Sequence, residues 1–242
     1  MIDTATLCPF IPFPTPILRG RFIKREKRFL AHMEMESGAR VIAHCANTGS
    51  MRGSLREGAP TLMWDSKNPK RKYTLSWKAI QLDNTWIGID TSLPNALVAE
   101  AISMGFIGPL AGYATIQRER KISDESRIDI YLTDGEAKDC YVEVKNVTLV
   151  EDGVARFPDA VTTSGLKHLG ELMKKVGEGE RAAMVYVIQR GDGYSFKPAD
   201  DIDPLYGKKL REAHSAGVEV YALSTEVSEK GVEATGLLPI KL

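Results

Sequence analysis

The first ninety residues alternate hydrophobic and polar side chains over short stretches. An alternation with a period of two is typical of β-strands that bury one face. The pattern predicts strands at residues 17–24, 28–35, 40–44, 61–65, 73–82 and 86–89. Short strands at this spacing indicate a small closed barrel, either an OB-fold-like barrel or another small β-barrel.

The pattern changes near Asp90. Pro94 and Gly105 bracket a predicted helix at residues 95–104, because proline suits a helix start and glycine suits a helix end. Further helices are predicted at 163–176 and 204–215, and strands at 113–118, 127–133, 140–149, 182–189 and 218–223. This order predicts an α/β (α+β) domain, a mixed sheet flanked by helices. We therefore expect two domains, residues 1–90 and residues 91–242. The strand-like alternation of 218–223 excludes a helix-turn-helix.

Charge separates the same two parts. The chain of 242 residues has a net charge of zero, but residues 1–90 contain 14 Lys and Arg against 8 Asp and Glu, a net charge of +6. A basic domain indicates a polyanionic partner, although a solvated basic surface would look the same. The sequence shows no apolar run long enough for a membrane span and no signal peptide. Three scattered cysteines fit a reducing compartment, so we expect a cytoplasmic protein.

The clearest chemistry lies in a predicted hairpin around Asp134-Gly135. If this hairpin centres on Glu136, Asp129 lies opposite Glu143, and Arg127 lies opposite Lys145. Two carboxylates at that distance repel each other unless a cation lies between them, and Mg²⁺ prefers such oxygen ligands. Lys145 would share the face of Glu143, where it could orient or deprotonate a water molecule. The alternative is a surface hairpin with a cross-strand salt bridge.

Asp129 followed by Glu143-Val144-Lys145 resembles the PD-(D/E)xK nuclease signature. The preceding helix carries Glu100 where many of those nucleases carry another acid. Longer segments resemble the sugar fermentation stimulation protein A (SfsA) family over nearly the whole chain: residues 44–51, 90–95, 127–145, 157–162 and 167–172. Within these segments, Ala46 replaces an expected proline and Ser164 an expected arginine.

The resemblance implies an OB-fold-like barrel followed by a PD-(D/E)xK restriction-endonuclease-like domain. It also implies DNA binding with little sequence preference and a metal-dependent phosphodiesterase site that uses Mg or Mn. Asp129 and Glu143 would be direct metal ligands, Glu100 would assist directly or through water, and Lys145 would activate the attacking water. The alternative is a non-catalytic DNA-binding regulator of sugar utilisation genes on a nuclease-like scaffold. RNA is a less favoured partner than DNA.

Other residues are candidates for nucleic-acid contact. The loop with Asn47, Thr48 and Ser50 could receive a phosphate, or its glycine could simply form a tight turn. A second loop is rich in cations, Lys70, Arg71 and Lys72, which suit the nucleic-acid backbone, although they would also suit a solvated loop. The helix at 163–176 adds Lys167 and His168, since this helix often supplies an auxiliary polar residue in nucleases of this shape.

Overall fold

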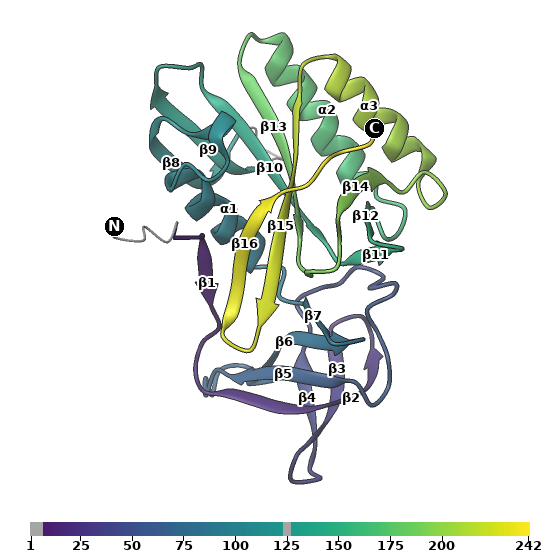
Figure 1. Ribbon diagram of the computed structural model, residues 1–242. Coiled ribbons are helices and arrows are strands. Elements are labelled where there is room, and N and C mark those ends of the chain that lie inside the picture. The colour runs from purple at the N-terminus through teal and green to yellow at the C-terminus, as the bar shows by residue number, and fades with distance from the viewer. Residues whose placement is uncertain (1–6, 123–126) are drawn as a thin grey trace, which may run out of the picture.

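The computed structural model describes residues 7–122 and 127–242 and contains two β-sheet units (Figure 1). The first unit is a six-stranded antiparallel sheet in the order β4-β3-β2-β5-β6-β7, closed into a barrel where His44 of β4 pairs with Ser76 of β6. Its strands are β2 (Ile17–Glu26), β3 (Leu30–Met35), β4 (Arg40–His44), β5 (Pro60–Asp65), β6 (Leu75–Leu82) and β7 (Thr85–Gly88). The apolar faces of these strands surround Trp77, which is fully buried and stacks on Phe22.

The second unit is a seven-stranded mixed sheet in the order β1-β16-β15-β13-β10-β9-β8. Its strands are β1 (Phe10–Pro12), β8 (Tyr113–Lys121), β9 (Arg127–Gly135), β10 (Cys140–Val147), β13 (Arg181–Ile188), β15 (Glu219–Ser228) and β16 (Gly231–Leu237). The central strands β10, β13 and β15 run parallel, and β13 is buried along almost its whole length. A central parallel strand reads as a continuous apolar run because both of its faces are covered.

Helices cover the two faces of this sheet (Figure 1). Helix α1 (Leu93–Ser103) packs its apolar side chains on one face, in a cluster with Val142 and Val144 of β10. Helices α2 (Thr163–Gly177) and α3 (Pro204–Ser215) pack on the other face, in a cluster with Met184 and Tyr186 of β13. A small sheet, β11 (Leu149–Glu151), β12 (Val154–Phe157) and β14 (Ser195–Pro198), and a 3₁₀ turn, η1 (Gly108–Leu110), complete the unit.

The two units share one apolar core. Leu62 and Ala79 of the barrel belong to the same buried cluster as Leu97 of α1 and Val185 of β13. In addition, residues 10–12, which lie within the predicted first domain, form β1 and pair with β16 at the edge of the second sheet. The second sheet therefore contains both β1, near the start of the described chain, and β16, near its end.

The predicted architecture, an OB-fold-like barrel and a mixed sheet flanked by helices, is confirmed. The six barrel strands and three helices appear with ends that differ from the expected ones by at most two residues. The short strands β1, β11, β12 and β14 were not expected, because three or four residues carry too little alternation to be recognised. Strand β16 was missed because its glycines read as turn signals.

Candidate nuclease site

The candidate site lies where β9 and β10 separate. These strands pair in the predicted register, Cys140 opposite Leu132 and Val142 opposite Ile130, and the pairing then stops. Beyond that point, Asp129 Oδ2 accepts a hydrogen bond of 2.8 Å from the backbone N–H of Val144. The expected cross-strand pairs Asp129–Glu143 and Arg127–Lys145 are wrong, because the β9–β10 ladder ends at Ile130 and Val142.

Glu143, Lys145 and His168 meet beside this fork. Glu143 and Lys145 share a face of β10, and α2 packs on that face and contributes His168. Lys145 Nζ donates to Glu143 Oε1 at 2.6 Å and lies 2.9 Å from His168 Nδ1. His168 Nδ1 also contacts Glu143 Oε1. His168 Nδ1 can serve only one of these contacts as a hydrogen bond at a time: with a proton it donates to Glu143, and without one it accepts from Lys145.

The two carboxylates have opposite pKa shifts. Burial, together with the nearby charge of Glu143, raises the pKa of Asp129 to about 6. Burial would also raise the pKa of Glu143, but the contact with His168 and the charge of Lys145 outweigh it and lower that pKa. Neighbouring acids with separated pKa values are typical of sites that carry out acid–base or metal chemistry.

Helix α1 contributes Asn95 to this site, and not the predicted Glu100. Asn95 Nδ2 donates to Asp129 Oδ1 at 2.8 Å and lies 3.5 Å from Glu119 Oε1. Glu100 follows Asn95 by five positions, roughly 140° around the helix axis. Within residues 7–122 and 127–242, no hydrogen bond or ion pair joins Glu100 to Asp129 or Glu143.

Sequence reasoning missed both Asn95 and Glu119. Glu119 lies opposite Asp129 on the neighbouring strand: Arg118 and Arg120 on either side of it pair with Ile130 and Ile128 in an unbroken register, and Glu119 itself has a positive φ of 56°. No sequence pattern predicts a positive φ at a glutamate. The sequence gives only a weak indication that Asn95 belongs to the site, because Asn95 lies in the first turn of a helix whose start was predicted.

The donor set fits a hard divalent cation. Asp129 and Glu143 supply carboxylate oxygens at the fork, and Mg²⁺ is commonly bound by only one or two carboxylates together with water. The two adjacent carboxylates are buried, and the pKa of Asp129 is raised. A bound cation would offset the repulsion between them. Within the described ranges, no three or more His, Cys, Asp and Glu side chains form a group that could hold a metal ion, so these two carboxylates are the protein ligands that the site offers.

The loop with Asn47, Thr48 and Ser50 joins the two units. Asn47 Oδ1 accepts from the Gly49 N–H at 2.9 Å, and the Ser50 hydroxyl donates to the Asp159 carbonyl at 2.8 Å. Asp159 Oδ2 in turn accepts from the Met51 N–H at 2.8 Å. Asp159 is therefore the residue that holds the barrel loop, and the exposed Thr48 is the member of the loop with a free side chain.

The remaining candidates are spread over the surface. Lys70 and Lys72 are exposed between β5 and β6, whereas Arg71 donates to the Ser76 hydroxyl at 3.1 Å. Trp77, which could have stacked on a base, is part of the barrel core and donates to the Ala79 carbonyl. Lys167 is exposed and lies 3.9 Å from Glu171 on the outer side of α2, so the site includes His168 and not its neighbour.

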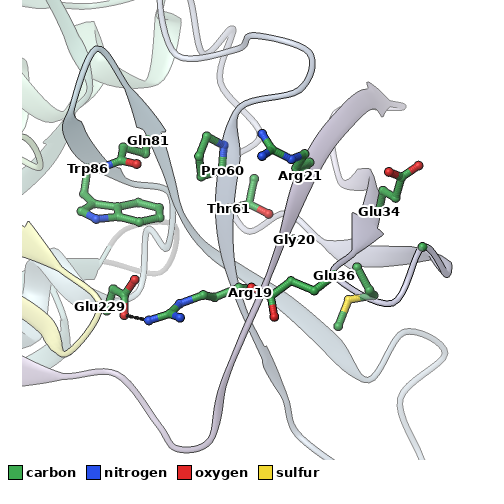
Figure 2. A pocket seen from close by; sticks show the side chains of 12 residues that line it. Arg19, Gly20, Arg21, Glu34, Glu36, Pro60, Thr61, Gln81, Trp86 and Glu229 are labelled. Atoms are coloured by element: carbon green, nitrogen blue, oxygen red, sulfur yellow. Dashed lines mark hydrogen bonds and ion pairs between the residues drawn. The ribbon is translucent and has the colours of Figure 1, made fainter.

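A cavity of about 540 Å³ on the barrel is less suited to a polyanion (Figure 2). Arg19 and Arg21 line it, but so do Glu34, Glu36 and Glu229. Figure 2 shows that Arg19 points at Glu229, which lies after β15, so this arginine forms an ion pair between the two units. Its charge is already compensated.

The fold and the site together define a class of protein: an OB-fold barrel joined to a restriction-endonuclease-like domain. Comparison with known families agrees, since residues 23–89 match the SfsA N-terminal OB domain and residues 92–231 match the sugar fermentation stimulation protein RE domain. The chain belongs to the sugar fermentation stimulation protein (SfsA) family.

Individual relatives match over nearly their whole length. The chain is 48% identical to the sugar fermentation stimulation protein homolog of Geotalea uraniireducens, over 95% of this chain and 99% of the relative. It is 49% identical to that of Rhodospirillum rubrum, over 94% and 98%. The solved structure of Pyrococcus furiosus SfsA in complex with Ca²⁺ superposes with a TM-score of 0.86 at 25% identity, covering 98% of this chain and all of that one.

No helix within the described ranges is long and apolar enough to cross a membrane.

Proposed function

We propose that the protein is a divalent-cation-dependent nuclease that binds DNA with little sequence preference. The observation that carries the proposal is the fork between β9 and β10, where Asp129 meets the N–H of Val144 and Glu143 meets Lys145 and His168. Mg²⁺ or Mn²⁺ is the proposed cofactor. The Ca²⁺ complex of the Pyrococcus furiosus relative supports divalent-cation binding in the family.

Asp129 and Glu143 would hold the cation, which would neutralise their charge and polarise the scissile phosphate. Lys145 is the side chain placed to act on the water molecule and the phosphate. Its ammonium lies 2.6 Å from Glu143 Oε1, so it can orient a water molecule beside that carboxylate and balance negative charge on the phosphate. His168 Nδ1 contacts both Lys145 Nζ and the same Glu143 oxygen, and Asn95 fixes the carboxylate of Asp129.

Nicking of supercoiled plasmid tests the proposal. We expect cleavage in Mg²⁺ or Mn²⁺ and none in EDTA. Asp129→Asn, Glu143→Gln and Lys145→Met should each reduce the rate by about 10²–10⁴-fold, the range lost with a group that carries acid–base or electrostatic catalysis. Glu233→Gln is the matched control, since it removes one carboxylate charge at an exposed position of β16, three strands away from β10 in the sheet.

The same protein preparations distinguish the nuclease from the alternative function, a non-catalytic DNA-binding regulator. An electrophoretic shift that persists in EDTA, with no nicking in either metal, would contradict the nuclease and support the regulator. Competition between DNA and RNA oligonucleotides of one sequence decides which polymer is bound; the proposal expects DNA to compete better.

A further inference from the structure

A second cavity, of about 380 Å³, lies between the barrel and the nuclease-like unit. The barrel side is formed by residues 47–50, and the other side by Thr148 and by residues 156–162 and 164. Asn146, which directly follows Lys145 on β10, lines it, and Ser164 lies one helical turn before His168 on α2. The cavity is therefore adjacent to the candidate nuclease site, and its volume falls in the range of small-ligand pockets.

Two polar side chains in this cavity are almost fully buried and have unused hydrogen-bonding groups. Thr148 is 5% exposed, and within the described chain its hydroxyl has no partner, although its carbonyl accepts from Arg190. Asn47 is 7% exposed, and its Nδ2 has no partner among the described residues while Oδ1 is taken by Gly49. Neither atom is fully enclosed, so both are open to a ligand in the cavity.

The start of α2 adds further donors. The Thr162 side chain caps only the N–H of Gly165, so the N–H groups of Thr163 and Ser164 remain for an outside acceptor. The positive end of the helix dipole favours an anion at this position. Two of the acceptors that line the cavity are occupied: Asn146 Oδ1 accepts from Gln189, and Asp159 Oδ2 accepts from Met51.

The donors at the start of α2 and on Asn47 and Thr148 favour an oxyanion. The charge of the lining limits which oxyanion. Arg28 contributes one positive charge and Asp159 one negative charge, and the charge of Arg156 is already compensated by Glu151 and Asp201. A lining without a large excess of positive charge suits a singly charged phosphodiester better than a doubly charged terminal phosphate.

We propose that this cavity binds one internal phosphodiester of the DNA strand, next to the bond that the fork would cleave. Its position beside a cleavage site rests on the proposed nuclease function. The phosphodiester site itself does not, because it can be measured by binding without any cleavage.

Asn47→Asp is the most informative variant. Aspartate keeps the oxygen that accepts from Gly49, so the loop is preserved, but it replaces the free amide by a negative charge inside the cavity. Asn84→Asp makes the same charge change in the exposed β6–β7 turn and is the matched control. Thr148→Val removes only the buried hydroxyl, and Thr148→Ser restores it.

Binding of a fluorescent DNA oligonucleotide is measured in EDTA and in Ca²⁺ at several salt concentrations. We expect Asn47→Asp to weaken binding about tenfold and to reduce the slope of log K against log[salt] by roughly 0.7–0.9, one phosphate contact. Asn84→Asp and Thr148→Ser should bind like the unmodified chain, and Thr148→Val should bind several-fold more weakly. Equal affinity and slope for Asn47→Asp and Asn84→Asp would overturn the proposal.

A second experiment identifies which phosphate of the DNA strand occupies the cavity. Oligonucleotides with a single neutral methylphosphonate are compared at each internal position, together with strands that carry a terminal phosphate or a terminal hydroxyl. We expect one internal position to weaken binding to the unmodified chain and to have no further effect on Asn47→Asp. A loss confined to the terminal phosphate would contradict an internal site. Absence of nicking alongside this coupling would remove the nuclease and leave the phosphodiester site standing.

Discussion

At the scale of single residues, Asp129 and Glu143 are neighbouring acids whose charges have opposite effects on stability. The pKa of Asp129 is raised from 3.8 to about 6 by burial and by Glu143, so its ionised form is favoured less in the folded chain than in the unfolded chain. Its charge therefore costs about 3 kcal/mol above pH 6–7, and nothing at a pH well below 3.8, where both states are protonated. The pKa of Glu143 is lowered despite burial, so its charge stabilises the fold at neutral pH.

Asp129→Asn should therefore raise the free energy of unfolding by about 2–3 kcal/mol near pH 7.5 in EDTA, and by much less near pH 4. Asn95 can rotate its amide to match the new side chain. Glu143→Gln, the matched variant, should lower the free energy at pH 7.5. Urea unfolding at the two pH values measures both, and a destabilised Asp129→Asn at neutral pH would contradict the raised pKa. Added Ca²⁺ should raise the Tm of the unmodified chain and not that of Asp129→Asn.

At the scale of elements, two of the three glycines of α2, Gly165 and Gly170, have opposite surroundings. A Cβ at Gly165 would lie 2.8 Å from Thr162 Cγ2 and 2.8 Å from Tyr206 Cε2 on α3, whereas a Cβ at Gly170 would meet nothing within 4 Å. Gly165 is therefore needed for the close approach of α2 and α3. Gly170 only lowers the helix propensity of an element that carries His168.

We expect Gly165→Ala to lower the free energy of unfolding by about 1–3 kcal/mol, because the helix must move away from Tyr206. We expect Gly170→Ala to raise it by about 0.5–1 kcal/mol. Thermal unfolding measures both, and His168 gives a second readout, since a displaced α2 should slow plasmid nicking in Gly165→Ala alone. Equal stability for the two variants would contradict the close packing at Gly165.

The strands and helices also show how much of the structure can be predicted from the sequence. Alternation and the Asp134-Gly135 turn were sufficient to predict the register of β9 and β10, and alternation placed Glu143 and Lys145 on one face, whereas His168 came from the resemblance to nucleases. The departures have local causes: the positive φ at Glu119, the early separation of β9 from β10, and the turn of α1 that presents Asn95 in place of Glu100. Each depends on tertiary packing, which periodicity does not encode.

At the scale of the whole molecule, the shared core makes the two units interdependent. Leu62 and Ala79 of the barrel are fully buried against the second unit, and β1 binds the edge strand β16. We therefore expect one cooperative unfolding transition. The three tryptophans, Trp64, Trp77 and Trp86, all report the barrel, whereas circular dichroism at the helix band reports α1, α2 and α3. Coincident transitions would agree with the shared core, and two separated midpoints would contradict it.

The interface also includes a half-buried acceptor, Asp159. It accepts from the N–H of Met51, a residue that is 1% exposed, so Asp159→Ala leaves a buried donor unpaired. We expect a loss of about 1–3 kcal/mol in the free energy of unfolding and faster hydrogen exchange in residues 45–53. Asp159→Asn keeps an oxygen at this position and should restore most of the loss. Glu229→Gln is the matched control: it breaks the Arg19 ion pair between the same units, but both side chains are about half exposed, so the cost should stay below about 1 kcal/mol. If Asp159→Ala and Glu229→Gln cost the same and leave exchange in the loop unchanged, Asp159 does not hold the barrel against the nuclease-like unit.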